Sequence, residues 1–201
     1  MTMPPRLRKL VLTAHVATSV GWLGAVAGFL ALAVAGRTSQ HAQTVRGSIL
    51  AMEPMGWFVL VPLSLASLLT GLVQSLGSTW GLFRHHWVMA KLLINVFASF
   101  VLLLYMRTLD DLAGVAADPT TSAEDLRVLR DPSPVLHAGL ALLLLLVATT
   151  LAVYKPRGMT RYGQRRQQQR ALAKQHQQQA LSQPEPQRLL PGRDQGVQGS
   201  R

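Results

Sequence analysis

Residues 10–35 of this chain are LVLTAHVATSVGWLGAVAGFLALAVA, a run without a single charged side chain. A helix of about 20 apolar residues crosses a hydrocarbon layer of ~30 Å, so this run is long enough to span a membrane. His15 and Trp22 lie two turns apart on one face of the predicted helix. A histidine inside a membrane span is costly, and its presence indicates either a paired structural group or a functional site.

Three further apolar runs predict three more spans, and they cover about residues 54–77, 87–106 and 134–154. The expected fold class is all-α: a polytopic membrane protein whose four transmembrane helices form a bundle over residues 1–155. We expect a short polar loop over 36–53. A longer acidic loop over 107–133 should contain a short surface helix that begins near Thr121 or Ser122.

The C-terminal segment differs in composition from the membrane domain. The formal net charge of the chain is +11, and residues 155–201 hold ten Lys or Arg against Glu185 and Asp194. We expect residues 156–201 to form a basic, Gln- and Arg-rich tail, helical over about 160–180 and disordered beyond that. A basic tail beside apolar spans indicates a partner in the anionic lipid bilayer and argues against nucleic acid.

Positive charge also predicts the topology. Residues 1–9 and the connection that contains Arg84 are basic, as is the tail, so both termini should be cytoplasmic in a multi-pass arrangement. This topology places His15, Gln74 and His86 in the inner leaflet of the membrane. The chain has no cysteine, which excludes disulfides and thiolate metal sites within it.

A second set of polar side chains lies on the third span. Lys91, Asn95 and Ser99 follow one another at intervals of four residues and share a helix face. Together with the inner-leaflet residues they suggest a heme site. Neutral imidazole is a usual axial ligand of heme iron, and cationic or amide groups can hold the propionates. The candidate cofactor-binding residues are His15, His86, Trp22, Arg84, Asn95 and Gln74, with Lys91 as a candidate catalytic ammonium.

Each of these residues also has a structural interpretation. His15 can hydrogen-bond to a carbonyl or hydroxyl group of a neighbouring helix. Lys91 can extend its ammonium group to the headgroups, and the amides of Gln74 and Asn95 can join helices.

Two other classes of function remain open. His137, together with Met52 and Met55, supplies ligand types that suit copper. The candidate metal ligands are therefore His137 and the two histidines of the heme hypothesis, His15 and His86. Gly24 and Gly28 are spaced for close helix approach, which suggests a homodimer or a non-catalytic membrane scaffold.

The segments AHVATSVGWLGA (14–25), VPLSLASLLTGL (61–72) and WGLFRHHWVMAKLLI (80–94) resemble an uncharacterised bacterial family of four-span integral membrane proteins. More distantly, the histidine and tryptophan of the first span, the TGL of the second and the Trp87-x-x-x-Lys91 of the third are similar to HemJ-type protoporphyrinogen oxidases and CopD-like copper resistance proteins. The HemJ resemblance implies heme b and functional roles for His15 and Lys91. Those enzymes carry a further histidine late in the third span, whereas this chain has Leu104, Tyr105 and Met106 there.

The resulting hypothesis is a protein of the bacterial cytoplasmic membrane whose inner-leaflet site binds heme b or a related tetrapyrrole. The residues do not determine whether the protein is an enzyme. If it is one, we expect a membrane oxidoreductase that acts on a porphyrinogen or a quinone. The alternatives are a copper-handling accessory and a scaffold.

Overall fold

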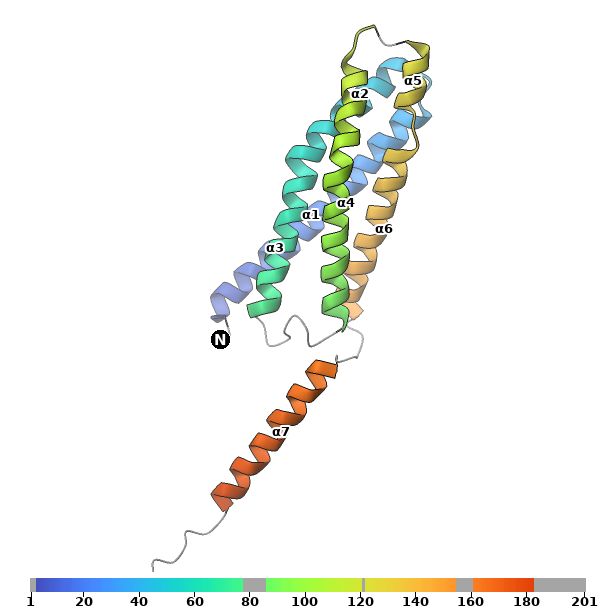
Figure 1. Cartoon of the computed structure of the whole chain (residues 1–201). Helices are drawn as coiled ribbons and strands as arrows, with labels where there is room; N and C mark the ends of the chain where they lie inside the picture. The colour runs from blue at the N-terminus through green and yellow to red at the C-terminus, as the bar shows by residue number, and fades with distance from the viewer. Residues whose placement is uncertain (1–2, 78–85, 121, 155–160, 183–201) are drawn as a thin grey trace, which may run out of the picture. The chain divides into compact units, whose positions relative to one another are not determined.

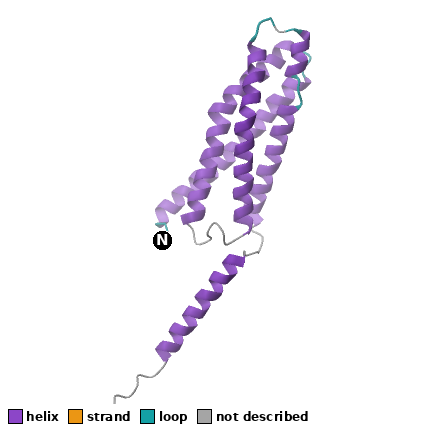
Figure 2. Cartoon of the chain, in the orientation of Figure 1, coloured by secondary structure: helices purple, strands orange, loops and turns teal. Residues whose placement is uncertain are grey.

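The computed structural model describes residues 3–77, 86–120, 122–154 and 161–182, and every regular element in these ranges is helical (Figure 1; Figure 2). The elements are α1 (Pro5–Thr38), α2 (Ala42–Met55), the π-helix η1 (Gly56–Leu60), α3 (Val61–Gly77), α4 (His86–Ala117), α5 (Ala123–Leu129), α6 (Ser133–Tyr154) and α7 (Arg161–Ser182). The chain divides into two compact units, Met1–Gly163 and Gln164–Arg201. All elements except α7 lie within the first unit.

Four stretches of the chain are long and apolar enough to cross a membrane. They are α1, the continuous rod of α2, η1 and α3, helix α4, and the stretch Leu126–Tyr154. Their outer surfaces carry large apolar side chains such as Phe58, Phe100 and Leu140, all more than half exposed. Exposed apolar side chains on this scale suit a lipid environment and not water. The all-helical prediction with four such helices is confirmed.

The four long stretches surround one core, and each of them packs against two neighbours. Helices α1 and α4 each contact both the α2–η1–α3 rod and α6, so the rod and α6 lie between them. The largest side chains of the buried core, at 0–2% exposure, are Trp22, Ile49, Met52, Met106 and Leu109. The start of α1, the end of α3 and the start of α4 lie at one end of the bundle, and α5 lies at the other (Figure 1).

The prediction of a polar loop over residues 36–53 is wrong, because α2 occupies most of this segment. Val45, Ile49 and Met52 recur at helical spacing and are buried against the bundle. Such an amphipathic stripe lacks the continuous apolar run that marked the other spans, yet it is sufficient to hold a helix in a bundle.

Helix α4 also extends beyond its expected end at residue 106, to Ala117. Arg46 of α2 binds its last turn, donating from Nε to Ala116 O (2.8 Å) and from Nη2 to Asp118 O (2.5 Å). A guanidinium group at this position satisfies carbonyls that the helix itself leaves without partners. Just beyond, the Thr120 hydroxyl and N–H both donate to the carboxylate of Asp118 and lower its pKa.

Two expected short helices are present. α5 is the predicted surface helix of the acidic connection, and α7 matches the helix predicted over about 160–180. The disorder predicted after residue 180 falls largely on residues 183–201, which lie outside the described residues.

Candidate functional site

His15 projects from α1 against α3. Its Nδ1 lies 3.1 Å from the carbonyl oxygen of Ser67 and 3.2 Å from Thr70 Oγ1. A carbonyl oxygen only accepts, so Nδ1 carries the ring proton of the neutral imidazole and donates it. The Thr70 hydroxyl donates to Ala66 O at 2.6 Å, and therefore presents a lone pair to His15. The free lone pair of the neutral ring is consequently on Nε2, to which no described residue is hydrogen-bonded.

The close contact of His15 with α3 depends on Gly71. A Cβ atom at position 71 would lie 2.9 Å from His15 Cε1 and 3.3 Å from Nδ1, closer than carbon atoms approach without displacement. The imidazole thus lies against the α3 backbone in the space that a larger residue would fill.

Other polar side chains continue this contact across three helices. Ser19 and Ser67 share a hydrogen bond of 2.9 Å between their Oγ atoms. Asn95 of α4 donates from Nδ2 to the same Ser67 hydroxyl at 3.5 Å. Ser67 is 2% exposed, so these bonds form inside the bundle. We call His15, Ser19, Ser67, Thr70 and Asn95 the polar cluster.

The other described residues predicted for the inner leaflet lie at the end of the bundle where α3 ends and α4 begins. Gln74 Oε1 is buried without a hydrogen-bond partner in the part of the chain that the structure describes. Lys91 Nζ lies 4.8 Å from the centroid of the Trp87 ring, a cation–π distance, one turn before Asn95. His86 is exposed at the first position of α4. Arg84 lies outside the described residues.

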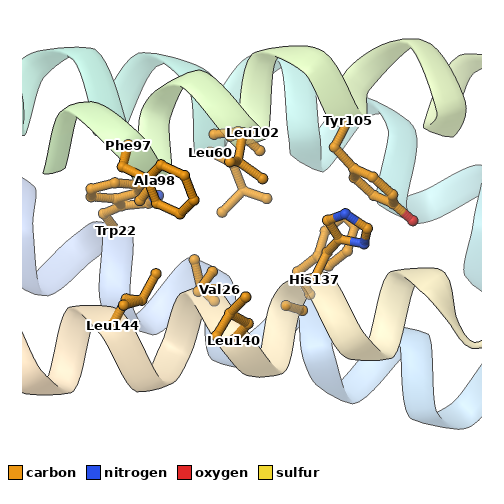
Figure 3. A pocket seen from close by; sticks show the side chains of 14 residues that line it. Trp22, Val26, Leu60, Phe97, Ala98, Leu102, Tyr105, His137, Leu140 and Leu144 are labelled. Atoms are coloured by element: carbon orange, nitrogen blue, oxygen red, sulfur yellow. The ribbon is translucent and has the colours of Figure 1, made fainter. Parts of the chain in front are cut away.

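Trp22 does not share a pocket with His15. It lines a separate cavity of about 70 Å³ that lies between α1, α4 and α6 and that His15 does not reach (Figure 3). Trp22 is 2% exposed, and its Nε1 has no hydrogen-bond partner among the described residues. Although the two side chains share one helix face, the structure separates them, since His15 contacts α3 and Trp22 enters the cavity.

His137 lies at the other end of this cavity. Its ring stacks on Tyr105 with centroids 4.3 Å apart and planes 22° from parallel. Its Nδ1 donates to Ser133 O at 2.9 Å. The two methionines of the copper alternative lie elsewhere: Met52 is in the core, and neither it nor Met55 lines the cavity.

In the described ranges, no three His, Asp or Glu side chains lie close enough together to hold one metal ion. The two glycines of the scaffold alternative, Gly24 and Gly28, are both exposed on α1. A Cβ at Gly28 would lie 3.2 Å from the Met55 methyl group of the same chain, whereas a Cβ at Gly24 has nothing within 4 Å.

Sequence patterns missed two features of this region. The sequence pattern predicted no role for Gly71 itself, because its contact with His15 depends on how α1 and α3 are aligned. The Tyr105–His137 stack had no sequence signal, since it joins two helices that are separate in the chain.

Comparisons with known proteins add no assignment. No family model matches the chain, and neither a curated protein nor a solved structure matches it. The argument for function therefore rests on the geometry of these residues.

Proposed function

We propose that this chain is an integral membrane protein that binds heme b, or a closely related tetrapyrrole, with His15 as the axial ligand. The observation that carries the proposal is the hydrogen bond from His15 Nδ1 to the Ser67 carbonyl. A ligating histidine usually donates its other ring N–H to a carbonyl or carboxylate, which fixes the tautomer and makes the ligating nitrogen more basic. His15 has this arrangement, and its Nε2 is the free nitrogen.

The surrounding residues support a porphyrin at the same end of the bundle. Bound heme supplies one-electron transfer and an iron centre. Lys91 and His86 offer positive or hydrogen-bonding groups for the propionates, and the buried Gln74 oxygen is an acceptor for a protonated carboxyl or a water molecule. Thr70 and Gly71 orient and accommodate the imidazole, and Asn95 reaches it through Ser67.

We further propose that the protein lies in the bacterial cytoplasmic membrane with both termini in the cytoplasm, which puts His15 in the inner leaflet. The basic segments at the start of α1 and in the tail support this orientation, because they favour the cytoplasmic face and its anionic lipid.

The heme content of purified protein tests the proposal. Wild type and His15→Ala are expressed with heme supplied in the medium, purified in detergent, and compared by their oxidised and dithionite-reduced visible spectra. Wild type should show a b-type reduced α-band, and His15→Ala should lose it. His41→Ala is the matched control, since His41 is exposed and precedes α2 at the opposite end of the bundle. A colourless wild type, or equal heme in His15→Ala and His41→Ala, would contradict the proposal.

A further inference from the structure

The cavity between α1, α4 and α6 contains a buried hydrogen-bond donor without an acceptor. The indole N–H of Trp22 is a donor only, and burying it unpaired costs free energy that an apolar residue would not cost. Figure 3 shows the Trp22 ring directed into the cavity from α1, facing Phe97 and Ala98 of α4. The missing partner is therefore an acceptor that enters the cavity.

Water is a poor candidate for this acceptor. A buried water molecule requires two to four polar partners. The other polar side chains of the lining, Tyr105 and His137, lie at the opposite end of the cavity (Figure 3), whereas the side chains around Trp22 are apolar: Val26, Leu60, Phe97, Ala98 and Leu144. The ligand must instead combine an apolar body with a carbonyl-type oxygen.

Depth in the bundle distinguishes among such molecules. Trp22 lies close to the middle of α1, roughly 25 Å along the helix axis from each end at 1.5 Å per residue. The ester carbonyls of phospholipids sit at the edge of the hydrocarbon layer, about 15 Å from its centre. An acceptor at the level of Trp22 must belong to a molecule that dissolves completely in the hydrocarbon.

The shape and lining of the cavity favour a flat ring. Aromatic side chains line it along its length, namely Trp22, Phe29, Phe97, Tyr105 and His137. The cavity of about 70 Å³ is smaller than the ~150 Å³ that accommodates benzene, so it admits only one edge of a ring. Its remainder would lie between Phe97 and Leu140, which line the mouth and are each 54% exposed on the lipid side of the bundle.

We propose that this cavity binds the head ring of a membrane quinone, a cyclic diketone with an isoprenoid tail, and that Trp22 Nε1 donates a hydrogen bond to one of its carbonyls. The ring packs edge-on against the aromatic lining, and the tail leaves between α4 and α6 into the lipid. The cavity does not include His15, so this proposal does not depend on heme binding.

The test observes the indole N–H directly. Full-length protein labelled with ¹⁵N-tryptophan, in lipid nanodiscs, is titrated with a 1,4-benzoquinone that carries one isoprenoid unit. The chain has four tryptophans, and only the Trp22 N–H signal should move downfield with a saturable dependence. A benzene ring with the same tail but without carbonyls is the control ligand. An unsaturable shift, no shift at Trp22, or an equal shift with the control ligand would overturn the proposal, and the last result would indicate an acyl or hydrocarbon occupant.

Two variants extend the test. Trp22→Phe keeps the ring but removes the donor, and should weaken quinone binding about three- to tenfold, as expected for one hydrogen bond. Trp57→Phe is the matched control, because Trp57 donates to Asp110 outside the cavity, and it should leave binding unchanged. Ala98→Leu fills the cavity and should abolish the saturable shift. A quinone affinity unaltered by both Trp22→Phe and Ala98→Leu would also overturn the proposal. The same titration on His15→Ala distinguishes quinone binding from heme binding, because the quinone-induced shift of the Trp22 signal should persist in a heme-free variant.

Discussion

His15 and Gly71 form a complementary pair across the α1–α3 contact. The imidazole occupies the space in which a side chain at position 71 would lie, and its Nδ1 reaches the Ser67 carbonyl one turn away. Backbone geometry thus leaves the free lone pair on Nε2, since a carbonyl cannot donate to Nδ1.

A substitution at Gly71 should affect the heme site without removing a ligand. In Gly71→Ala the new Cβ would meet His15 Cε1 at 2.9 Å, so the ring must shift and lose its bond to Ser67. We expect heme affinity to fall at least tenfold, comparable with the 10- to 100-fold effects of disturbing groups that orient a metal ligand. Titration of the apo-protein with hemin, followed at the Soret band, measures this.

Gly24→Ala is the matched control for that experiment, because the same methyl group would enter open space there. If Gly71→Ala binds hemin as tightly as Gly24→Ala does, His15 is not held in the way described above.

At this scale the sequence drew attention to His15 but did not show its surroundings. His15 stood out because it interrupts an uncharged span, and that signal is local. Its partners Ser67, Thr70 and Gly71 are more than 50 positions away, and small or hydroxyl residues are common in membrane helices for packing alone. Only the alignment of α1 with α3 shows which of them face the imidazole.

The irregular helix η1 is the main feature at the level of elements. It lies between Pro54 and Pro62, and its i→i+5 bond runs from Val61 N–H to Gly56 O. Each proline lacks the N–H that a regular helix would use, so the backbone hydrogen bonding of the helix is already weakened before and after η1. Helix α4 approaches η1 closely at Gly56, since a Cβ at this position would lie 2.7 Å from both Sδ and Cε of Met106 in α4.

Enlarging residue 56 should therefore separate the rod from α4. Gly56→Leu is expected to lower the free energy of unfolding by about 1–3 kcal/mol, the usual cost of overpacking a tight contact. Gly47→Leu, in α2 where nothing lies within 4 Å, should be neutral or slightly stabilising, because leucine favours the helix over glycine. Helicity followed by circular dichroism during titration with SDS measures both variants. Equal midpoints for the two would show that the η1–α4 contact is not tight.

The length of α4 depends on a side chain from another element. Arg46 binds the carbonyls of Ala116 and Asp118, so Arg46→Met should leave them without this donor and fray the last turn. We expect a loss of about 1–3 kcal/mol in stability, since the bonds come from a charged donor. Amide hydrogen exchange should accelerate over residues 113–117.

Arg107→Met serves as the comparison, because Arg107 is an exposed residue of the same helix. If the two variants exchange alike at the end of α4, the Arg46 cap does not hold this turn.

Helices with a long continuous apolar sequence could be predicted, and helices without one could not. The four spans were evident from long apolar runs, whereas α2 was missed because its buried stripe alternates with polar residues. The extension of α4 was missed because Asp110 and Asp111 suggested a loop, and an acidic exposed face is compatible with a helix that leaves the membrane.

At the scale of the whole molecule, the proposed orientation follows from the distribution of charge. The chain contains no cysteine, so single cysteines can be introduced without background labelling. Gln43→Cys at the start of α2 should react with an impermeant maleimide in intact cells. Gln169→Cys in α7 should react only after the membrane is opened. Both positions are exposed. The opposite labelling pattern would reverse the topology and place His15 in the outer leaflet.

The central claim is that the imidazole at position 15 ligates heme iron, and replacing that group chemically tests it most directly. His15→Gly removes the ring and leaves space beside Gly71, and free imidazole can then be added to the purified protein. We predict that the reduced α-band of wild type is lost in His15→Gly and returns when imidazole is added, whereas the same addition leaves the wild-type band unchanged. A wild type without any heme band, or a His15→Gly variant that keeps the band without imidazole, would contradict the account.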